Sequence, residues 1–281
     1  MGNGQWIEVG NGVFQRRYDP LDVSIGLVLG PTGAVVIDTR NNPAEALAII
    51  EDVAEGFSLP IMAAINTHAH YDHSFGNQVF KAEGIPIYGH HLIARHYANY
   101  EKPHLDKVKN HPGTEPDKSW QEVVLTPPTV PVQAPTTIGP GGREIELLPL
   151  APGHTDTDLA VRIPDAGIWF LGDIVEESGP PMFGSGAHPL GWPLVLESLL
   201  ERIGESDAII PGHGTPVDRA FVVRQQQQLE LLADELSAAH AQEIPAGKVR
   251  FSAGLLQIWP AQFLREAVQD VYAQLGTSTR S

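Results

Sequence analysis

Hydrophobic residues recur along the chain with two spacings, one typical of strands and one typical of helices. The first 38 residues contain short strand-like runs, and residues 27–38 place two apolar runs on either side of a Gly-Pro-Thr-Gly turn, which predicts a hairpin. Residues 43–55 begin with proline and have apolar residues at helical spacing, so a helix is expected there. A short buried strand is expected over residues 61–66.

The alternation of strands and helices continues along the chain. Further strands are expected over residues 85–89, 144–150, 159–164, 168–173 and 208–214. Further helices are expected over residues 76–84, 221–239 and 261–275. This order predicts a layered α/β domain, and the pattern alone leaves the sheet topology open.

Two segments fit this alternation less well. Residues 101–142 are rich in proline, glycine and mixed charge, and we interpret them as a solvated loop rather than as an anion-binding lid. Residues 224–281 are interpreted as a helical C-terminal extension of a single domain that spans residues 1–281. The apolar residues of this extension would pack on the core or form a dimer contact, and the pattern favours neither.

Composition and charge restrict the partners that we expect. The formal charge of −16, from 34 acidic and 18 basic residues, argues against nucleic acid and anionic membranes and leaves a small-molecule substrate. The chain lacks an apolar run of about 18 residues and a signal-like N-terminus, so a cytoplasmic location is expected. With no cysteine, any metal must bind to nitrogen and oxygen.

The stretch "NTHAHYDHSFGN" at residues 66–77 concentrates metal-binding side chains just after a predicted strand. His68 and His70 lie two positions apart, so their imidazoles can face one ion. Asp72 and His73 follow a turn and can reach a second ion. This stretch alone suggests one metal site or two.

Three later fragments each place one ligand-type side chain at a strand end. They are "PGHTDTD" with His154, "WFLGDIV" with Asp173 and "IIPGHGTP" with His213. Loops at strand ends gather over one edge of a sheet, so these side chains are expected near the first cluster. Together the fragments supply seven ligands, which is enough for two ions.

With these motifs the sequence resembles the metallo-β-lactamase-fold superfamily over about residues 5–223, with its HxHxDH signature at 68–73. The resemblance implies an α/β fold of the αββα sandwich type, with two mixed sheets face to face and helices outside. It also implies that His68, His70 and His154 hold one ion, that Asp72, His73 and His213 hold a second, and that Asp173 bridges them. Asp38 matches a family aspartate that supports the ligand loops from behind.

This donor set suits two zinc ions and would also accept manganese or iron. Such ions supply Lewis acidity and an activated water, so hydrolysis is the expected reaction. Asp173 is expected to set the spacing of the metals, and Asp72 to orient the water or to carry a proton to the leaving group. These two carboxylates are the candidate catalytic residues.

The segment 176–193 after Asp173 is expected to lie beside the metals and to contact the substrate. It is rich in glycine and proline, has no lysine or arginine, and contains the candidate substrate-binding residues Met182, Phe183, His188 and Trp192. Such a wall favours a neutral or apolar organic group. We therefore expect an ester, thioester or lactone as substrate.

Other functions within the superfamily stay open. A β-lactamase-like amide hydrolase is one alternative, although the lack of cysteine excludes the lactamases that use a cysteine ligand. An oxidoreductase of the persulfide dioxygenase type, with a single iron, is another. No basic clamp for glutathione is recognisable, which argues against a glyoxalase II-like role, and the net charge argues against a nuclease. A purely structural metal site and a homodimer are further hypotheses.

Overall fold

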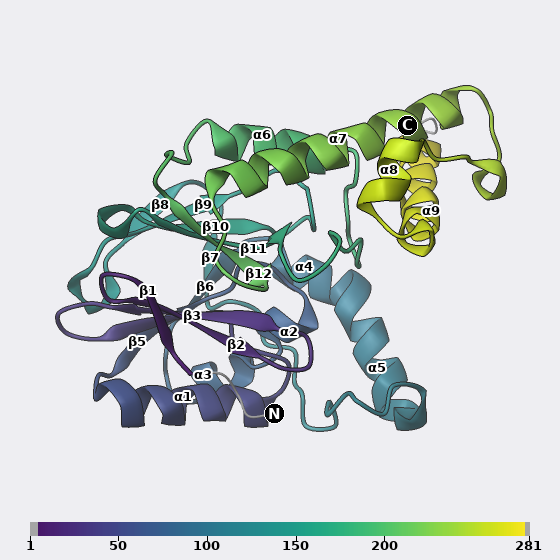
Figure 1. The fold of residues 1–281 in the computed structure, drawn as a ribbon. Coiled ribbons are helices and arrows are strands. Elements are labelled where there is room, and N and C mark those ends of the chain that lie inside the picture. The colour runs from purple at the N-terminus through teal and green to yellow at the C-terminus, as the bar shows by residue number, and fades with distance from the viewer. Residues whose placement is uncertain (1–4, 279–281) are drawn as a thin grey trace.

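The structure of the protein, a computed structural model, describes residues 5–278. Two layers of strands are stacked on each other and helices cover the outside, which is the expected αββα sandwich (Figure 1). The strands are β1 Ile7–Gly10, β2 Val13–Tyr18, β3 Val23–Leu29, β4 Ala34–Ile37, β5 Ile61–Ile65, β6 Ile87–His90, β7 Val130–Val132, β8 Thr136–Ile138, β9 Ile145–Pro149, β10 Leu159–Ile163, β11 Ile168–Glu176 and β12 Ala208–His213.

The hydrogen-bonded strands follow the order β7-β6-β5-β4-β3-β12-β11-β10-β9-β8, and β2 and β1 continue from β3. The layers are joined where β3 meets β12 through a single antiparallel pair, Val23 and His213. The parallel pairs are β4 with β5, β5 with β6, β6 with β7, and β11 with β12. The other strand pairs are antiparallel. The two mixed halves are therefore continuous at one edge.

The main core lies between the two layers of strands. Strands β2 to β5 contribute Val13, Val28, Val35, Ile37, Ala63 and Ile65, and strands β9 to β12 contribute Ile145, Leu147, Leu159, Val161, Ile163, Ile168, Phe170 and Ile210. Burial of such side chains stabilises each by about 1.5–3 kcal/mol relative to exposure. This packing holds the strand ends in fixed relative positions.

Helices cover both outer faces of the sandwich. They are α1 Pro43–Phe57, α2 Tyr71–Ser74, α3 Asn77–Ala82, α4 Ile93–His96, α5 Lys102–Asn110, α6 Trp192–Leu200, α7 Arg219–Ala241, α8 Ala253–Ile258 and α9 Ala261–Ser278. The start of α1 follows from its sequence, because the Asn42 side chain accepts a hydrogen bond from the Glu45 N–H and Pro43 occupies the first turn. Its apolar residues Ala46, Ile49 and Val53 pack against the adjacent strands.

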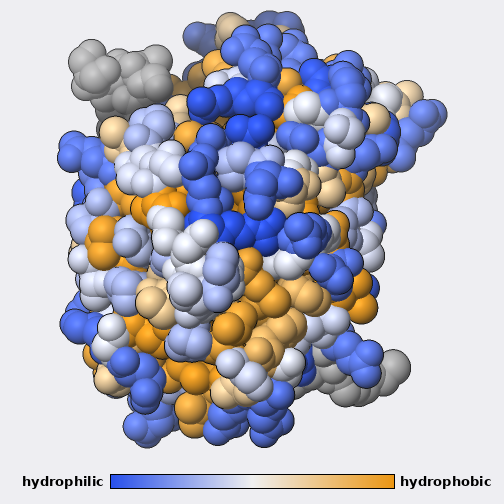
Figure 2. Space-filling view, turned by 90° about the vertical axis from the view of Figure 1, so that its left-hand side faces the viewer, coloured by the Kyte–Doolittle hydropathy of each residue, from blue (hydrophilic) through white to orange (hydrophobic). Residues whose placement is uncertain are grey.

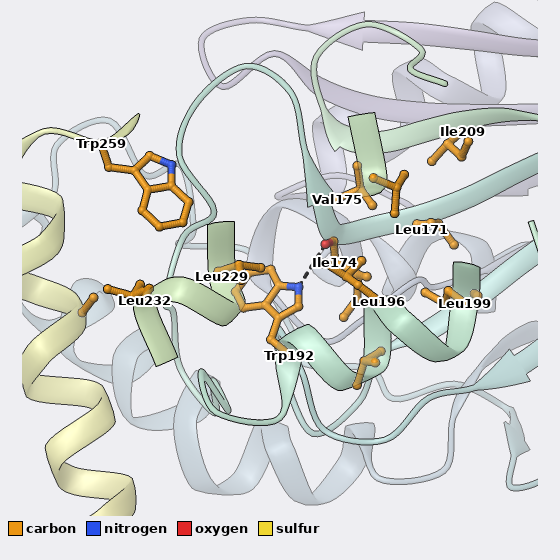
Figure 3. Packing of buried hydrophobic residues seen from close by; sticks show 14 of the residues in the cluster. Leu171, Ile174, Val175, Trp192, Leu196, Leu199, Ile209, Leu229, Leu232 and Trp259 are labelled. Atoms are coloured by element: carbon orange, nitrogen blue, oxygen red, sulfur yellow. Dashed lines mark hydrogen bonds between the residues drawn. The ribbon is translucent and has the colours of Figure 1, made fainter. Parts of the chain in front are cut away.

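Helices α6, α7 and α9 share a second core on the opposite face, centred on Trp192 (Figure 3). The Trp192 Nε1–H donates to the carbonyl of Ile174 at 3.0 Å, and the Gln225 side chain donates to the same carbonyl at 2.8 Å. Both bonds attach helices to β11, the strand that carries Asp173. The helical face therefore supports the candidate metal centre from outside.

The prediction of a loop over residues 101–142 was wrong in part, because helix α5 and the strands β7 and β8 lie within it. Residues 102–110 form helix α5, which follows a π-helical turn, Tyr97–Glu101. The buried residues of α5 are Leu105 and Val108. Two apolar residues among many charged ones give too weak a helical pattern to be recognised in the sequence. The helices α2, α4, α6 and α8 were not predicted either.

The outer surface carries both hydrophilic and hydrophobic residues. On the face seen in Figure 2, hydrophilic residues are interspersed with hydrophobic ones, which gather in its lower part. Within residues 5–278, none of the helices has the length and apolar character needed to cross a bilayer.

Candidate metal centre

Four strands bring predicted ligands and the supporting Asp38 to one edge of the sandwich. Asp38 follows β4, His68 follows β5, Asp173 lies within β11, and His213 ends β12. Because β4 and β5 are parallel, and β11 and β12 are parallel, each pair presents its carboxyl ends together. The contact of β3 with β12 then places the two pairs side by side.

All seven predicted metal ligands are buried and lie in two adjoining groups. The ligand atoms within each group are within 4.8 Å of one another, and the groups are His68, His70, His154 and Asp173, and Asp72, His73 and His213. These are the two sets that the sequence resemblance implied. Residues separated by up to 145 positions in the chain therefore meet at one point.

The outer ring nitrogens of three of the histidines are held by backbone carbonyls. His213 Nδ1 donates to Leu21 at 2.7 Å, His154 Nδ1 to Met182 at 3.1 Å, and His70 Nε2 to Ser185 at 3.0 Å. A carbonyl oxygen can only accept, so each of these nitrogens carries the proton in the neutral ring. The inner nitrogens then present lone pairs to the centre, which is the form that binds metal.

The inner nitrogens face one another without a donor between them. His154 Nε2 lies 2.9 Å from His70 Nδ1, and His73 Nε2 lies 3.3 Å from His213 Nε2. In addition, His68 Nε2 and Asp173 Oδ1 are buried and have no hydrogen-bond partner. Opposed lone pairs and unpartnered buried atoms are unfavourable unless a cation lies among them. The residues present therefore fit divalent metal ions.

Asp173 lies between the two groups. Its Oδ2 is 3.4 Å from both His154 Nε2 and His213 Nε2, and its Oδ1 is 3.1 Å from His73 Nε2. Burial opposes ionisation of this carboxyl, but His73, His213 and His68 together hold its pKa well below the usual range. Asp173 is therefore an anion with access to both groups, as expected for a bridging ligand.

The carboxylates shift the pKa values of the histidines in turn. Burial opposes protonation of His213, yet Asp173 and other acidic groups raise its pKa to about 10. For His154, burial dominates and lowers the pKa to about 3. The nearby negative charge, chiefly that of Asp173, thus outweighs burial at His213 but not at His154.

Asp38 supports this arrangement from behind. Its Oδ1 accepts from the Thr67 N–H at 2.8 Å, and its Oδ2 accepts from the Thr67 hydroxyl at 2.7 Å and from His73 Nδ1 at 2.8 Å. The carboxylate therefore fixes both the start of the ligand loop and the ring of His73, whose Nε2 is turned inward. This is the contact that the resemblance implied for Asp38.

The fold and the ligand set together place the chain among known proteins. The family model described as the Metallo-beta-lactamase superfamily matches residues 18–213. The chain belongs to this superfamily. Its two groups of buried His and Asp side chains are consistent with the metal site of this superfamily's enzymes.

Members with known names are similar to it at low identity. A "Metallo-beta-lactamase type 2" of Bacillus cereus is 26% identical over 223 residues, which are 78% of this chain and 76% of that protein. The "Acyl-coenzyme A thioesterase MBLAC2" of Homo sapiens is 26% identical over 227 residues, 73% of this chain and 79% of that protein. The solved structure of a metallo-beta-lactamase from Pontibacter korlensis has a TM-score of 0.64 at 21% identity and covers 80% of this chain and 98% of its own.

A cavity of about 760 Å³ opens over the metal centre of this superfamily member. Of the ligands, His70, Asp72, His154, Asp173 and His213 reach it. The segment after Asp173 contributes a further wall, as expected, through residues 178–180, 182, 184 and 185. This volume is in the range of sites that bind small organic molecules.

The structure corrects the contacts expected for three of the four candidate substrate-binding residues. Met182 lines the cavity, whereas His188 lines a separate cavity of about 460 Å³ beside α6. Trp192 is fully buried at the start of α6, and Phe183 packs edge-on against its ring. Trp192 packs in the core as the first residue of α6, whereas Phe183 is partly buried and stacks on Phe263, which lines the cavity.

Sequence reasoning missed several polar residues of the site. Glu176 lies at the end of β11, lines the cavity, and has a buried Oε1 without a hydrogen-bond partner. Glu101 and Ser185 also line it. The signal for Glu176 was its position three residues after Asp173, whereas Glu101 lies in the segment taken for a loop and had no such signal.

Ser185 connects the metal ligand His70 to a buried polar network. Its carbonyl accepts from His70, and its hydroxyl donates to Glu101 Oε1 at 2.6 Å. Behind Glu101, the ring of His96 bonds to Asp156 at 2.7 Å. The loop passes so close to His70 that a Cβ at Gly184 would lie 2.8 Å from the ring. The cavity wall and the orientation of His70 are therefore linked.

We expect Ser185→Ala to weaken zinc binding about tenfold, because the loop that holds His70 Nε2 loses its tie to Glu101. Competition with a chromogenic chelator measures this affinity directly. Ser198→Ala, on the exposed side of α6, is the matched control and should bind zinc as the unaltered protein does. Equal affinity of all three proteins would show that the hydroxyl does not position His70.

Proposed function

We propose that this protein is a dinuclear zinc hydrolase that cleaves an ester, thioester or lactone of a neutral or apolar small molecule. The observation that carries the proposal is the pair of adjoining ligand groups that share Asp173, at the floor of a cavity. Nitrogen and oxygen donors without thiolate suit zinc and also accept manganese or iron.

The chain's own residues have distinct roles in the proposed reaction. The ions, when bound, supply Lewis acidity and lower the pKa of water. Asp173, in contact with both groups, holds the two binding positions at a constant separation. Asp72 lines the cavity and turns its Oδ2 toward His213 Nε2 at 3.4 Å, so its Oδ1 would take a proton from the attacking water and pass it to the leaving group.

The charge of the cavity supports a neutral substrate. Of the residues that the structure describes, those that line the cavity include Glu101, Glu176 and Glu266 but no lysine or arginine. Carboxylate and phosphate groups of ligands are usually held by such cations. A substrate with several phosphates or with a carboxylate therefore fits this cavity poorly.

The names of the relatives support hydrolysis and leave two bond types. The thioesterase similarity favours a thioester or the chemically related ester, whereas the similarity to type 2 metallo-beta-lactamases favours a β-lactam amide. We place the amide second, because β-lactam antibiotics carry a carboxylate and the cavity offers it no cationic side chain.

Metal analysis and a substrate panel test the proposal together. Protein purified without added metal is expected to contain about two zinc ions per chain and to prefer an ester, thioester or lactone over a cephalosporin and a phosphodiester. Removal of metal by a chelator should abolish turnover, and zinc should restore it. One iron per chain with oxygen uptake on a persulfide would overturn the proposal, and a preference for the cephalosporin would replace it with the amide alternative.

A further inference from the structure

The start of helix α9 and the residue before it form one wall of the cavity above the candidate metal centre. Helices α8 and α9 extend from the far end of α7 to the side of the molecule where α4 and α5 lie (Figure 1). Pro260 and the first turns of α9, through Gln262, Phe263 and Glu266, line the cavity together with the metal ligands. This wall lies beyond residues 18–213, which the family model matches, so it is an addition to the common fold.

The face of α9 that points away from the cavity anchors the helix. Leu264, Ala267, Val268 and Val271 are almost fully buried and belong to the core shared with α7. Their spacing puts them on one side of the helix, and Phe263 and Glu266 lie on another. Helix α9 is therefore held by one face and presents a different face to the cavity.

Aromatic contacts connect this wall to the metal centre. Phe263 stacks on Phe183 with ring centroids 5.6 Å apart, and Phe183 contacts Trp192 at 5.7 Å. Trp192 in turn lies 5.2 Å from the ring of His154. Phe263 also packs on the ring of Trp259. Figure 3 shows Trp259 and Leu232 of α7 together at the left of the view. The position of Phe263 relative to the ligands is thus set by contiguous packing.

The wall combines apolar residues with one acidic residue, Glu266. Phe263, Pro260 and Met182 supply hydrophobic contact, and the Met182 side chain is 65% exposed. Gln262 donates to Glu266 at 3.2 Å, so these polar groups satisfy each other. Such a wall accepts an extended hydrocarbon or aryl group and disfavours an anionic one.

We propose that residues 260–266 select substrates with an extended, uncharged apolar group, such as a medium-length acyl chain, which lies against Phe263. This inference rests on the proposed hydrolytic function of the metal centre. Without Phe263, a long acyl chain loses its contact, while a short acyl group that stays at the metals is unaffected. The wall therefore acts on chain-length preference and not on the reaction itself.

The test compares p-nitrophenyl acetate with p-nitrophenyl octanoate on the zinc-loaded protein. Phe263→Ala is expected to lower kcat/KM for the octanoate about tenfold and to leave the acetate within about twofold. Phe251→Ala is the matched control, because Phe251 packs in the same helical core but does not line the cavity. An equal loss for both esters, or the same selective loss in Phe251→Ala, would overturn the proposal.

A second variant at an exposed position does not depend on the packing of α9. Glu266→Lys is expected to raise kcat/KM for a p-nitrophenyl ester with a terminal carboxylate about tenfold relative to the octanoate. Glu230→Lys, on α7 and away from the cavity, makes the same charge change and should have no such effect. A response to both substitutions, or to neither, would contradict the assignment of Glu266 to the wall.

Binding of octanamide separates this proposal from the hydrolytic one. Calorimetry with octanamide and acetamide requires no turnover, and the unaltered protein is expected to bind octanamide more tightly. Weaker binding of octanamide by Phe263→Ala than by Phe251→Ala supports the wall even if no ester is cleaved. Equal binding by both variants refutes the wall whatever the result for the esters.

Discussion

Replacement of Asp173 by alanine is expected to lower kcat/KM on the best ester of the panel by on the order of a thousandfold or more. Asp173 contacts His154, His213 and His73 at 3.1–3.4 Å, so its loss removes the anion common to both ligand groups. The metal content is expected to fall below two ions per chain. Steady-state kinetics and elemental analysis of the same preparation measure both effects, and His213→Ala should behave similarly.

The chain should stay folded in this variant, because the strand that carries Asp173 is held by the cores on both of its faces. Circular dichroism and a melting curve check this point. Asp165→Ala is the control, since this aspartate pairs with Arg143 at the surface. Unchanged turnover in Asp173→Ala or His213→Ala would rule out a two-metal mechanism.

Gly212→Ala is expected to damage both the fold and the site. A Cβ at this position would lie 1.8 Å from Asp173 Oδ1 and 2.7 Å from the carbonyl carbon of Gly172 in the neighbouring strand β11. The clash displaces the shared carboxylate, and a shift of about 1 Å at a reacting centre can reduce turnover about a hundredfold. Overpacking between paired strands should also lower the free energy of unfolding by about 3 kcal/mol.

A melting curve should show the lower stability of Gly212→Ala as a decrease in Tm of about 6 °C. Gly56→Ala provides the matched control. Gly56 lies in α1 with nothing within 4 Å of the added methyl group, so the change should stabilise the protein by about 0.5–1 kcal/mol and leave activity unchanged. A Gly212→Ala protein as stable and as active as the unaltered one would contradict the close approach of β11 and β12.

The metal ligands were predictable because each belongs to a short local pattern. His68, His70, Asp72 and His73 follow one strand within six positions, and each of the other three candidate ligands, His154, Asp173 and His213, directly follows a glycine. Polar side chains of this kind rarely occur together at strand ends without a site. The resemblance to the superfamily then supplied how the ligands are grouped, which spacing alone did not.

The substrate wall was less predictable, since it depends on where side chains point. The same segment places Met182 in the cavity and the Trp192 ring in the core, although both were candidates for substrate contact. A helix that begins at Trp192 decides the difference. Pro193 in its first turn is a start signal, but Gly191 before it has no side chain to cap the helix. Glu101, on a π-helical turn, reaches the cavity through the same kind of tertiary placement.

The sequence by itself determined the layered fold class, most strands and the helices α1, α7 and α9, and it named the seven side chains that the structure groups as candidate ligands. Local periodicity and strand-end chemistry are enough for these, because neither requires knowledge of distant contacts. Only the tertiary structure decided that α9 lines the cavity and that the Ser185 carbonyl accepts a hydrogen bond from His70. Both depend on contacts between residues far apart in the sequence, 80 positions for Phe263 and Phe183 and 115 positions for Ser185 and His70, and no short-range pattern encodes such contacts.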